Sequence, residues 1–278
     1  METLRIYTRL IRLGQWYKNL VIFLPLLFAP NVRPLTALVI GFLGFACVSS
    51  MTYIVNDWMD REKDRIHPVK KNRPLASGKV TGRQALLVSF LLALVVVGAV
   101  YLLGLFYGAI ILAYFVLTNL YSFGLKNIPL VDILIIASNF AMRMMAGLEE
   151  FPDITTGPYF GLLIGIIVIF LTHKRSNDIK MLGEKAVKHK PVLRYYTWKK
   201  NYIYRALAYA IVIFSFFIMW QNGLDFYLEA GLYLQLFVTS VILSLNPEYT
   251  SNPQHLFRSK IWTLILIGNI IQFTVFFL

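Results

Sequence analysis

The chain has 278 residues, of which 58% are hydrophobic, 15% aromatic and only 15% charged. Its mean hydropathy of +0.63 excludes a soluble globular domain and a disordered chain, because charged residues make up about 25% of a typical soluble domain. The long apolar runs are continuous rather than alternating, which favours membrane helices over a transmembrane β-barrel. The net charge of +13 then indicates basic loops on one side of a membrane and an anionic substrate.

Apolar runs long enough to cross a bilayer predict an all-α, polytopic membrane protein with nine transmembrane helices. In chain order these runs cover residues 17–31, 35–55, 84–103, 106–123, 129–148, 157–173, 202–220, 224–245 and 260–278. Pro25 and Pro30 predict that the first helix is tilted or kinked. Because no long linker or low-complexity segment divides the chain, residues 1–278 are expected to form a single integral membrane catalytic domain.

Basic residues gather on one side of the predicted spans. They occupy the N-terminal segment and two long loops, at residues 56–83 and 174–200. Of the 27 Lys and Arg residues, 24 fall on this side, in its loops or at the first two residues of a span. Arg33 alone falls on the opposite side, and Arg143 and Arg205 lie further inside spans. The positive-inside rule therefore predicts a cytoplasmic N-terminus and cytoplasmic catalytic loops, in a multi-pass protein of the cell (inner or plasma) membrane.

Three aspartates directly follow the second predicted span. Asp57, Asp60 and Asp64 are spaced at i, i+3 and i+7, so a continuing helix would place them on one face. Three like charges near a membrane are costly unless a cation lies among them, and Mg²⁺ takes one or two protein carboxylates together with phosphate oxygens. We therefore expect Asp57, Asp60 and Asp64 to be metal ligands and catalytic residues. The alternative is a solvated helix end of mixed charge.

Polar and basic residues surround these carboxylates, which argues against a simple metal store. Such cations suit a metal–phosphate complex, because they share the phosphate charge with Mg²⁺. The alternative is a topology signal alone. The candidate substrate-binding residues of this segment are Asn56, Arg65, Lys71 and Arg73.

The run from Asn56 to Asp64, with its continuations at 65–68 and 72–78, resembles the UbiA-type intramembrane prenyltransferase superfamily. This resemblance extends over most of the chain, from about Gly14 onward. It implies a nine-helix bundle of UbiA type, in which two Asp-rich regions on cytoplasmic loops hold Mg²⁺ and a pyrophosphate.

The segment that corresponds to the second Asp-rich region is basic. Its opening stretch, residues 172–178, has one acid, Asp178, beside Lys174 and Arg175. Together with the N-terminal stretch 15–19 (Gln-Trp-Tyr-Lys-Asn), this segment resembles the decaprenyl-phosphate phosphoribosyltransferase branch of the superfamily. At position 178 that branch has Glu, so Asp178 is a mild departure from its pattern.

The resemblance implies Mg²⁺-dependent transfer of 5-phosphoribose from phosphoribosyl pyrophosphate to a polyprenyl (decaprenyl-like) phosphate, with release of pyrophosphate. The lipid is then the acceptor, and the product would feed arabinan assembly in cell envelope biosynthesis. Lys174 and Arg175 are candidates for the donor's 5-phosphate, since Arg offers a bidentate fork. Lys18 is a candidate for the lipid phosphate or an interfacial anchor. The remaining candidate substrate-binding residues are Tyr121, Lys126 and Asp178.

Two ionisable residues inside the fifth predicted span are functional candidates by default. Asp132 lies about two turns from Lys126, and the alternative to a functional role is a simple ion pair between the two. Arg143 lies nearer the far side, where its side chain could instead snorkel outward to the interface.

Two other functions stay open from the residues. One is a UbiA-type prenyltransferase that moves a polyprenyl group from its diphosphate to an aromatic acceptor, and the single acid beside Lys174 and Arg175 argues against it. The other is a lipid transporter or flippase, for which internal repeats or broken midplane helices are expected. Nucleic acid is excluded as a partner because the basic loops are short, acid-interleaved and membrane-bound. A monomer and a homo-oligomer are both compatible with the sequence.

Overall fold

The structure, a computed structural model, describes residues 2–27, 35–66, 70–149, 156–183, 186–187 and 190–221, together with positions 238, 241 and 242. All regular elements in this part of the chain are helices. Residue contacts divide the chain into two compact units. Unit 1 comprises Met1–Leu125 and Asn139–Ile154, and unit 2 comprises Lys126–Ser138 and Thr155–Leu278. The single catalytic domain expected from the sequence stays a prediction.

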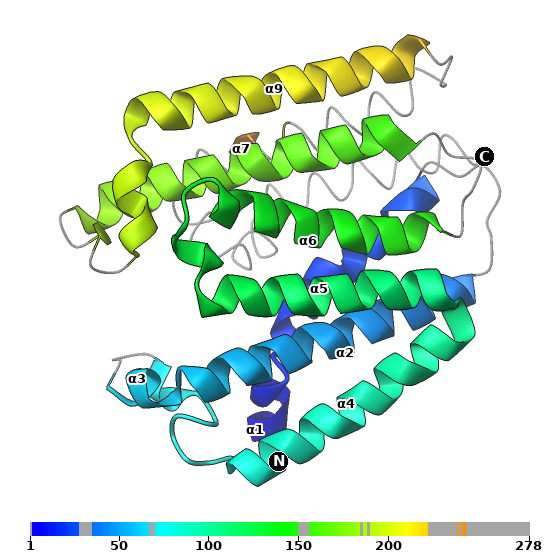
Figure 1. The fold of residues 1–278 in the computed structure, drawn as a ribbon, viewed down its shortest axis with the longest axis vertical. Coiled ribbons are helices and arrows are strands. Elements are labelled where there is room, and N and C mark those ends of the chain that lie inside the picture. Colours follow the sequence, from blue (N-terminus) through cyan, green and yellow to red (C-terminus); the bar gives the residue numbers. More distant parts are fainter. Residues whose placement is uncertain are drawn as a thin grey trace. The chain divides into compact units, whose positions relative to one another are not determined.

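Six helices of the described residues are long and apolar enough to cross a membrane. They match six of the predicted runs and are α2 (Leu35–Met59), α4 (Gly82–Leu103), α5 (Leu105–Phe123), α6 (Val131–Leu148), α7 (Thr156–Leu182) and α9 (Trp198–Gln221) (Figure 1). The chain is thus a multi-pass helical membrane protein. The predicted runs at 224–245 and 260–278 lie outside the described residues except at three positions, so the count of nine stays a prediction.

The first predicted span takes a different form from these six helices. Residues Leu13–Leu27 form the 3₁₀ helix η1, which contains Pro25, and residues 28–34 lie outside the described part. Proline has no N–H to donate and clashes with the preceding turn, so it disfavours a regular α-helix at this point. The short amphipathic helix α1 (Glu2–Leu10) precedes η1 and buries Leu10.

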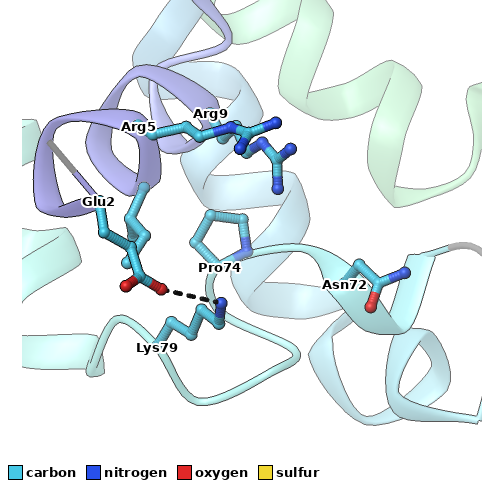
Figure 2. A pocket seen from close by; sticks show the side chains of 7 residues that line it. Glu2, Arg5, Arg9, Asn72, Pro74 and Lys79 are labelled. Atoms are coloured by element: carbon cyan, nitrogen blue, oxygen red, sulfur yellow. Dashed lines mark ion pairs between the residues drawn. The ribbon is translucent and has the colours of Figure 1, made fainter.

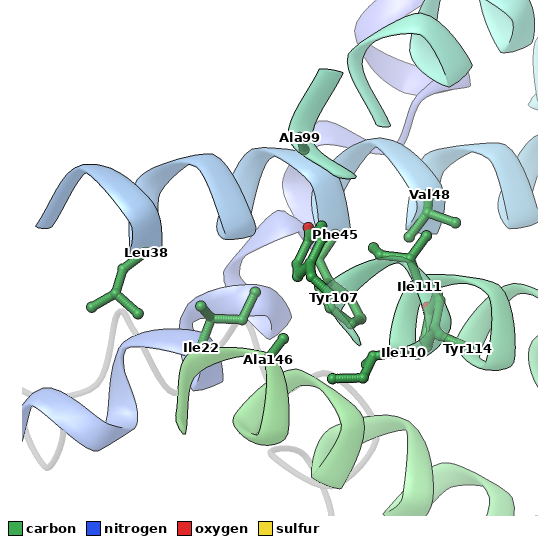
Figure 3. Close-up of a cluster of buried hydrophobic side chains, with 10 residues drawn as sticks. All are labelled: Ile22, Leu38, Phe45, Val48, Ala99, Tyr107, Ile110, Ile111, Tyr114 and Ala146. Atoms are coloured by element: carbon green, nitrogen blue, oxygen red, sulfur yellow. The ribbon is translucent and has the colours of Figure 1, made fainter. Parts of the chain in front are cut away.

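Helix α2 is the centre of unit 1, where it packs against η1, α4 and α5. Figure 3 shows the buried side chains between these elements. The ring of Phe45 meets the rings of Tyr107 and Tyr114 edge-on, at centroid distances of 6.0 and 5.5 Å. Gly44 allows this close approach, since a Cβ there would overlap the Tyr107 hydroxyl. The core is formed by Ile22, Leu38, Phe45, Val48, Ala99, Tyr107, Ile110, Ile111, Tyr114 and Ala146.

Local sequence signals explain the ends of α4. Thr81 and Gln84 form a capping box at its start, because the Thr81 side chain accepts from the Gln84 N–H and the Gln84 side chain accepts from the Thr81 N–H. At its end Gly104 has φ +95°, a backbone conformation that favours glycine, and α5 begins at the next residue. Large apolar side chains on α4, such as Leu86 and Phe90, are exposed, as expected for a lipid-facing helix.

Unit 2 is built on the contact between α7 and α9, which run side by side (Figure 1). Two glycines of α7 lie in this contact. A Cβ at Gly161 would overlap the Ser215 hydroxyl, and a Cβ at Gly165 would lie 2.6 Å from Val212 Cγ2. Small residues of this kind let two membrane helices approach closely.

Both predicted loops begin with helix. α2 continues to Met59, and after Asp60 the short helix α3 (Arg61–Arg65) follows. α7 continues to Leu182, so the prediction of a loop starting at residue 174 was wrong. The apolar run ends before the helix does, because the backbone hydrogen bonds of a helix do not require apolar side chains once the chain leaves the hydrocarbon region.

Candidate functional site

In unit 1 the carboxylates of Asp57 and Asp64 share one guanidinium group. Arg73 Nη1 donates to Asp57 Oδ1 at 3.0 Å and to Asp64 Oδ2 at 2.7 Å. Arg12 Nη2 also donates to Asp57 Oδ1, at 2.6 Å. Both aspartates are buried, whereas both arginines are about a quarter exposed. Buried carboxylates need such partners, and the structure therefore defines a charged cluster of two acids and two bases.

The three predicted carboxylates are not equivalent in this cluster. Asp60 lies at the junction of α2 and α3 with φ −87° and ψ 0°, and it is more exposed than Asp57 and Asp64. Its N–H still bonds to the Asn56 carbonyl, and the Asp64 N–H bonds to the Asp60 carbonyl. The chain thus keeps helical hydrogen bonds through the break while turning Asp57 and Asp64 toward Arg73.

The composition of the cluster bears on the expected metal. No group of three or more His, Cys, Asp or Glu side chains that could hold a metal occurs in the described ranges. Mg²⁺ in proteins is often bound by only one or two carboxylates, and phosphate oxygens of the substrate supply further ligands. The two carboxylates that now bind Arg73 match that number. The residues present therefore fit a metal–phosphate complex rather than a site built from three carboxylates, and Mg²⁺ stays a prediction.

Other predicted residues of unit 1 lie outside this cluster. Arg65 is exposed and donates to Glu62 at 2.8 Å and to the Ala76 carbonyl at 3.4 Å. Lys71 is exposed, and Asn56, Lys18 and Tyr121 are half-buried. Of the predicted basic residues Arg65, Lys71 and Arg73, only Arg73 thus contacts the carboxylates of Asp57 and Asp64. Arg12 was missed as a site residue because it lies 45 positions from Asp57, so no local spacing links the two.

A cavity of about 380 Å³ lies beside the same segment of unit 1 (Figure 2). α1 contributes Glu2, Arg5 and Arg9, and the segment before α4 contributes Asn72 and Lys79. Lys79 Nζ lies 3.8 Å from Glu2 Oε1. The charged side chains of the cavity are mainly basic, and Ile6 and Pro74 add an apolar part. No local sequence pattern predicts this cavity, because α1 and residues 72–79 meet only in the folded chain.

Unit 2 has a second buried charged cluster, centred on Asp132. Arg175 Nη2 lies 2.9 Å and Lys190 Nζ 3.2 Å from Asp132 Oδ2, and the Tyr196 hydroxyl donates to Asp132 Oδ1. Asp132 is fully buried. The alternative that Asp132 pairs with Lys126 is therefore wrong. Lys126 lies half-buried in the 3₁₀ helix η3 (Leu125–Asn127), and the carboxylate is bound instead by Arg175 and Lys190, which are far from it in the sequence.

This second cluster also changes the interpretation of Arg175. Its Nη1 lies 3.7 Å from Asp178 Oδ2, its side chain is 5% exposed, and its Nε has no hydrogen-bond partner. Arg175 is thus held by Asp132 and Asp178 rather than presented to solvent. Lys174 is half-buried beside it. The loop after α7 also contains a second acid, Glu184, which lies outside the described residues.

The environment of the second cluster shifts two pKa values. Burial, followed by the positive charge of Arg175, lowers the pKa of Lys190 to about 8, although Asp132 acts in the opposite direction. Burial and the hydrogen bond and negative charge of Asp132 raise the pKa of Tyr196. Perturbed groups of this kind occur at functional sites and in structural ion-pair networks.

The described residues form a helical membrane protein with one buried charged cluster in each unit, and comparison with known proteins places the chain in a family. The UbiA prenyltransferase family matches residues 20–264, so the chain belongs to that family. A decaprenyl-phosphate phosphoribosyltransferase of Corynebacterium glutamicum is 31% identical over 195 residues, which are 67% of this chain and 58% of that protein. A 4-hydroxybenzoate octaprenyltransferase of Shewanella sediminis is 32% identical over 135 residues, which are 46% of this chain and 47% of that protein.

The chain thus spans less than two thirds of the length of these relatives. Among solved structures, a UbiA homolog from Archaeoglobus fulgidus bound to GPP and Mg²⁺ aligns with a TM-score of 0.71 at 17% identity, covering 97% of this chain and 99% of that chain. At this identity the structural likeness concerns the fold alone, and it agrees with the all-helical UbiA architecture expected from the sequence.

Proposed function

We propose that this transferase moves 5-phosphoribose from phosphoribosyl pyrophosphate to a polyprenyl phosphate in the membrane, releasing pyrophosphate, with Mg²⁺ as cofactor. The observation that carries the proposal is the charge of the second cluster. Asp178 is the only acid of α7 and lies against Arg175. Lys174, Arg175 and Lys190 outnumber the carboxylates of Asp132 and Asp178, and such an excess of positive charge suits a donor with a phosphate in addition to its pyrophosphate. The similarity to the Corynebacterium relative supports the same substrate class.

The first cluster suits the leaving group. Asp57 and Asp64 would hold Mg²⁺ together with Asp60, which lies at the more exposed edge of the cluster, and the bound metal would offset the charge that develops on the departing pyrophosphate. Arg12 and Arg73, which now bind the carboxylates, would turn to the phosphate oxygens. The acceptor phosphate is already anionic, so no strong general base is required.

Taken by itself, unit 2 has cations that suit a phosphate monoester, and we propose that its ligand is the 5-phosphate of the donor, as the family resemblance implies. Lys174 and Lys190 are candidates for direct contact, because each is half-buried and carries a mobile ammonium group. Arg175 would act as a positioning residue, since its guanidinium is bound to Asp132 and Asp178. Lys18, Tyr121 and Lys126 stay candidate substrate-binding residues, and the cytoplasmic orientation of both clusters is part of this proposal.

The experiment is a membrane assay with radiolabelled phosphoribosyl pyrophosphate, polyprenyl phosphate and Mg²⁺. We expect wild type to move label into the lipid fraction, Asp60→Asn to lose at least 90% of the rate, and EDTA to stop the reaction reversibly. Asp60 is preferred over Asp57 and Asp64 because it is not buried in ion pairs. The matched control is Glu62→Gln, an exposed acid two residues away, which should retain activity. Metal-independent transfer would overturn the carboxylate–metal assignment.

A second candidate is prenyl transfer from a prenyl diphosphate to an aromatic acceptor, which the Shewanella relative favours. The same membranes supplied with a labelled prenyl diphosphate and 4-hydroxybenzoate test it. Labelled prenyl product without phosphoribosyl transfer would replace the first proposal. The transporter interpretation is set aside because the chain belongs to a transferase family.

A further inference from the structure

The interior of unit 1 contains an arginine surrounded by neutral acceptors. Arg143, in α6, is 5% exposed, so the alternative that its side chain snorkels outward is wrong. Its Nε donates to Asn19 Oδ1 at 2.7 Å and its Nη1 to the Asn139 carbonyl at 2.5 Å. Its Nη2 contacts Tyr114 Oη at 3.0 Å and Ser49 Oγ at 3.4 Å. All three nitrogens thus have partners, and each partner is uncharged.

No carboxylate forms an ion pair with Arg143 in the part of the chain that the structure describes. Three aromatic rings lie near its guanidinium carbon, those of Tyr114, Phe140 and Phe45, at 4.7, 5.5 and 5.8 Å from their centroids. Aromatic faces attract a cation without neutralising it. A buried charge without a counter-ion is costly, and an ionisable residue at membrane depth is a functional candidate. The arrangement therefore calls for an anion.

Asn19 supplies a second, independent observation. Its side chain is 1% exposed, and its Nδ2 has no hydrogen-bond partner. The amide orientation is determined by its neighbours, because Oδ1 accepts from both Arg143 Nε and Ser49 Oγ. A buried N–H donor without a partner costs free energy. An anion would satisfy both the unpaired N–H of Asn19 and the charge of Arg143, so the two side chains together have the properties of an anion-binding site.

This interior site lies on the same side of α2 as the charged cluster. Ser49, Tyr53 and Asp57 occupy three successive turns, so the two sites are about 12 Å apart along the helix axis at 1.5 Å per residue. Arg12 connects them, because its guanidinium lies 4.4 Å from the centroid of the Tyr53 ring and donates to Asp57. Polar and cationic groups thus continue from the end of α2 into the interior of unit 1.

We propose that Arg143 and Asn19 bind a phosphate monoester inside unit 1, separate from the cluster of Asp57 and Asp64. This assignment rests on the proposed function: we take the phosphate to be that of the acceptor, the polyprenyl phosphate, because the head group of a lipid would reach this site from the apolar interior of the membrane. The donor's 5-phosphate has the same chemistry, and the experiment below distinguishes the two sources. The phosphate accepts a hydrogen bond from Asn19 Nδ2 and forms an ion pair with Arg143. It replaces the 3.4 Å contact between Arg143 and Ser49, the longest of the four hydrogen bonds of Arg143.

The test is thermal unfolding of the purified full chain in detergent, titrated separately with farnesyl phosphate, farnesol and ribose 5-phosphate. We expect farnesyl phosphate to raise the unfolding temperature of wild type and farnesol to have little effect. In Arg143→Gln the apparent Kd for farnesyl phosphate should rise at least tenfold. The matched control is Arg205→Gln, another arginine inside a helix, which contacts His173 in unit 2 and should bind farnesyl phosphate as wild type does.

Asn19→Asp is a second variant, which tests the proposal even if Arg143→Gln does not fold. It places a carboxylate of the same shape against Arg143, so the unliganded protein should unfold at the same or a higher temperature while farnesyl phosphate loses its effect. Unchanged farnesyl phosphate binding in Asn19→Asp would overturn the proposal, as would equal stabilisation of wild type by farnesol. Stabilisation by ribose 5-phosphate alone, lost in Asn19→Asp, would support the phosphate site and assign it to the donor.

The result is separable from that of the transfer assay. Arg143-dependent binding of farnesyl phosphate without phosphoribosyl transfer would leave the phosphate site in place and refute the proposed reaction. Phosphoribosyl transfer at the wild-type rate, with the wild-type KM for polyprenyl phosphate, in Asn19→Asp would refute the phosphate site and leave the reaction in place.

Discussion

The guanidinium of Arg175 lies 2.9 Å from the carboxylate of Asp132, and neither side chain is more than 5% exposed. Arg175 comes from α7 and Asp132 from the first turn of α6, 43 positions apart in sequence numbering. Lys190 and Tyr196 donate to the same carboxylate. The carboxylate of Asp132 thus binds two cations and a phenol in unit 2, and all three lose a partner when it is removed.

Asp132→Asn should destabilise the protein strongly. The substitution leaves Arg175 and Lys190 buried without their shared counter-ion, and breaking a buried pair by removing one partner costs about 3–5 kcal/mol. Thermal or denaturant unfolding in detergent measures the loss. The control is Glu62→Gln, which removes exposed ion pairs with Arg61 and Arg65 and should cost about 0–1 kcal/mol. Equal effects of the two variants would contradict the buried network.

Lys190 should make stability depend on pH in the alkaline range. Its pKa is lowered to about 8 in the folded chain by burial and by Arg175, whereas an unfolded lysine has a pKa of about 10.4. Between these values the unfolded chain binds more protons, so the free energy of unfolding should rise as the pH increases from about 8 toward 10. Unfolding temperatures across this range measure the effect, and Lys190→Gln should remove that component. A wild-type curve identical to that of Lys190→Gln would rule it out.

Arg73→Gln should make the stability of unit 1 depend on Mg²⁺. Without Arg73, Asp57 and Asp64 lose their shared cation, and we expect a loss of about 3 kcal/mol in EDTA. Mg²⁺ that binds the folded state alone restores stability by mass action, about 2.7 kcal/mol at 100 times its Kd. Unfolding temperatures in EDTA and in MgCl₂ measure both effects.

The control for this metal effect is Arg65→Gln, since Arg65 pairs with exposed Glu62 and contacts neither aspartate. It should respond to MgCl₂ as wild type does. A response of Arg73→Gln no larger than that of Arg65→Gln would argue against metal binding between the two carboxylates.

Gly147→Ala should destabilise unit 1 by about 1–3 kcal/mol, as expected for overpacking. A Cβ at Gly147 would overlap the backbone carbonyl of Ile22 in η1, and backbone cannot move aside as a flexible side chain does. Gly98→Ala in α4 is the matched control, because no atom lies within 4 Å of its added Cβ; it should be neutral or stabilising by up to about 1 kcal/mol. Comparable unfolding temperatures of the two variants would exclude the close contact between α6 and η1.

Local sequence patterns were sufficient for most helices of the described chain. The runs at 35–55, 84–103, 106–123, 129–148, 157–173 and 202–220 correspond to the six candidate spans, because burial in a bilayer depends on the hydropathy of a continuous segment. The same patterns placed the end of α7 too early, at residue 173 instead of Leu182. Hydropathy falls where the chain leaves the apolar region, whereas the helix continues as long as its backbone hydrogen bonds do. The sequence patterns also suggested the family, through the spacing of the residues from Asn56 to Asp64.

The sequence by itself thus determined a polytopic helical protein of the UbiA family with carboxylates and bases at its helix ends. Only the tertiary structure decided which charges meet. Arg12 reaches Asp57, Arg175 and Lys190 reach Asp132, and Arg143 reaches Asn19. The reason is physical: a buried charge takes whichever partner the packing of the helices brings within hydrogen-bond distance, and that packing depends on contacts far apart in the chain.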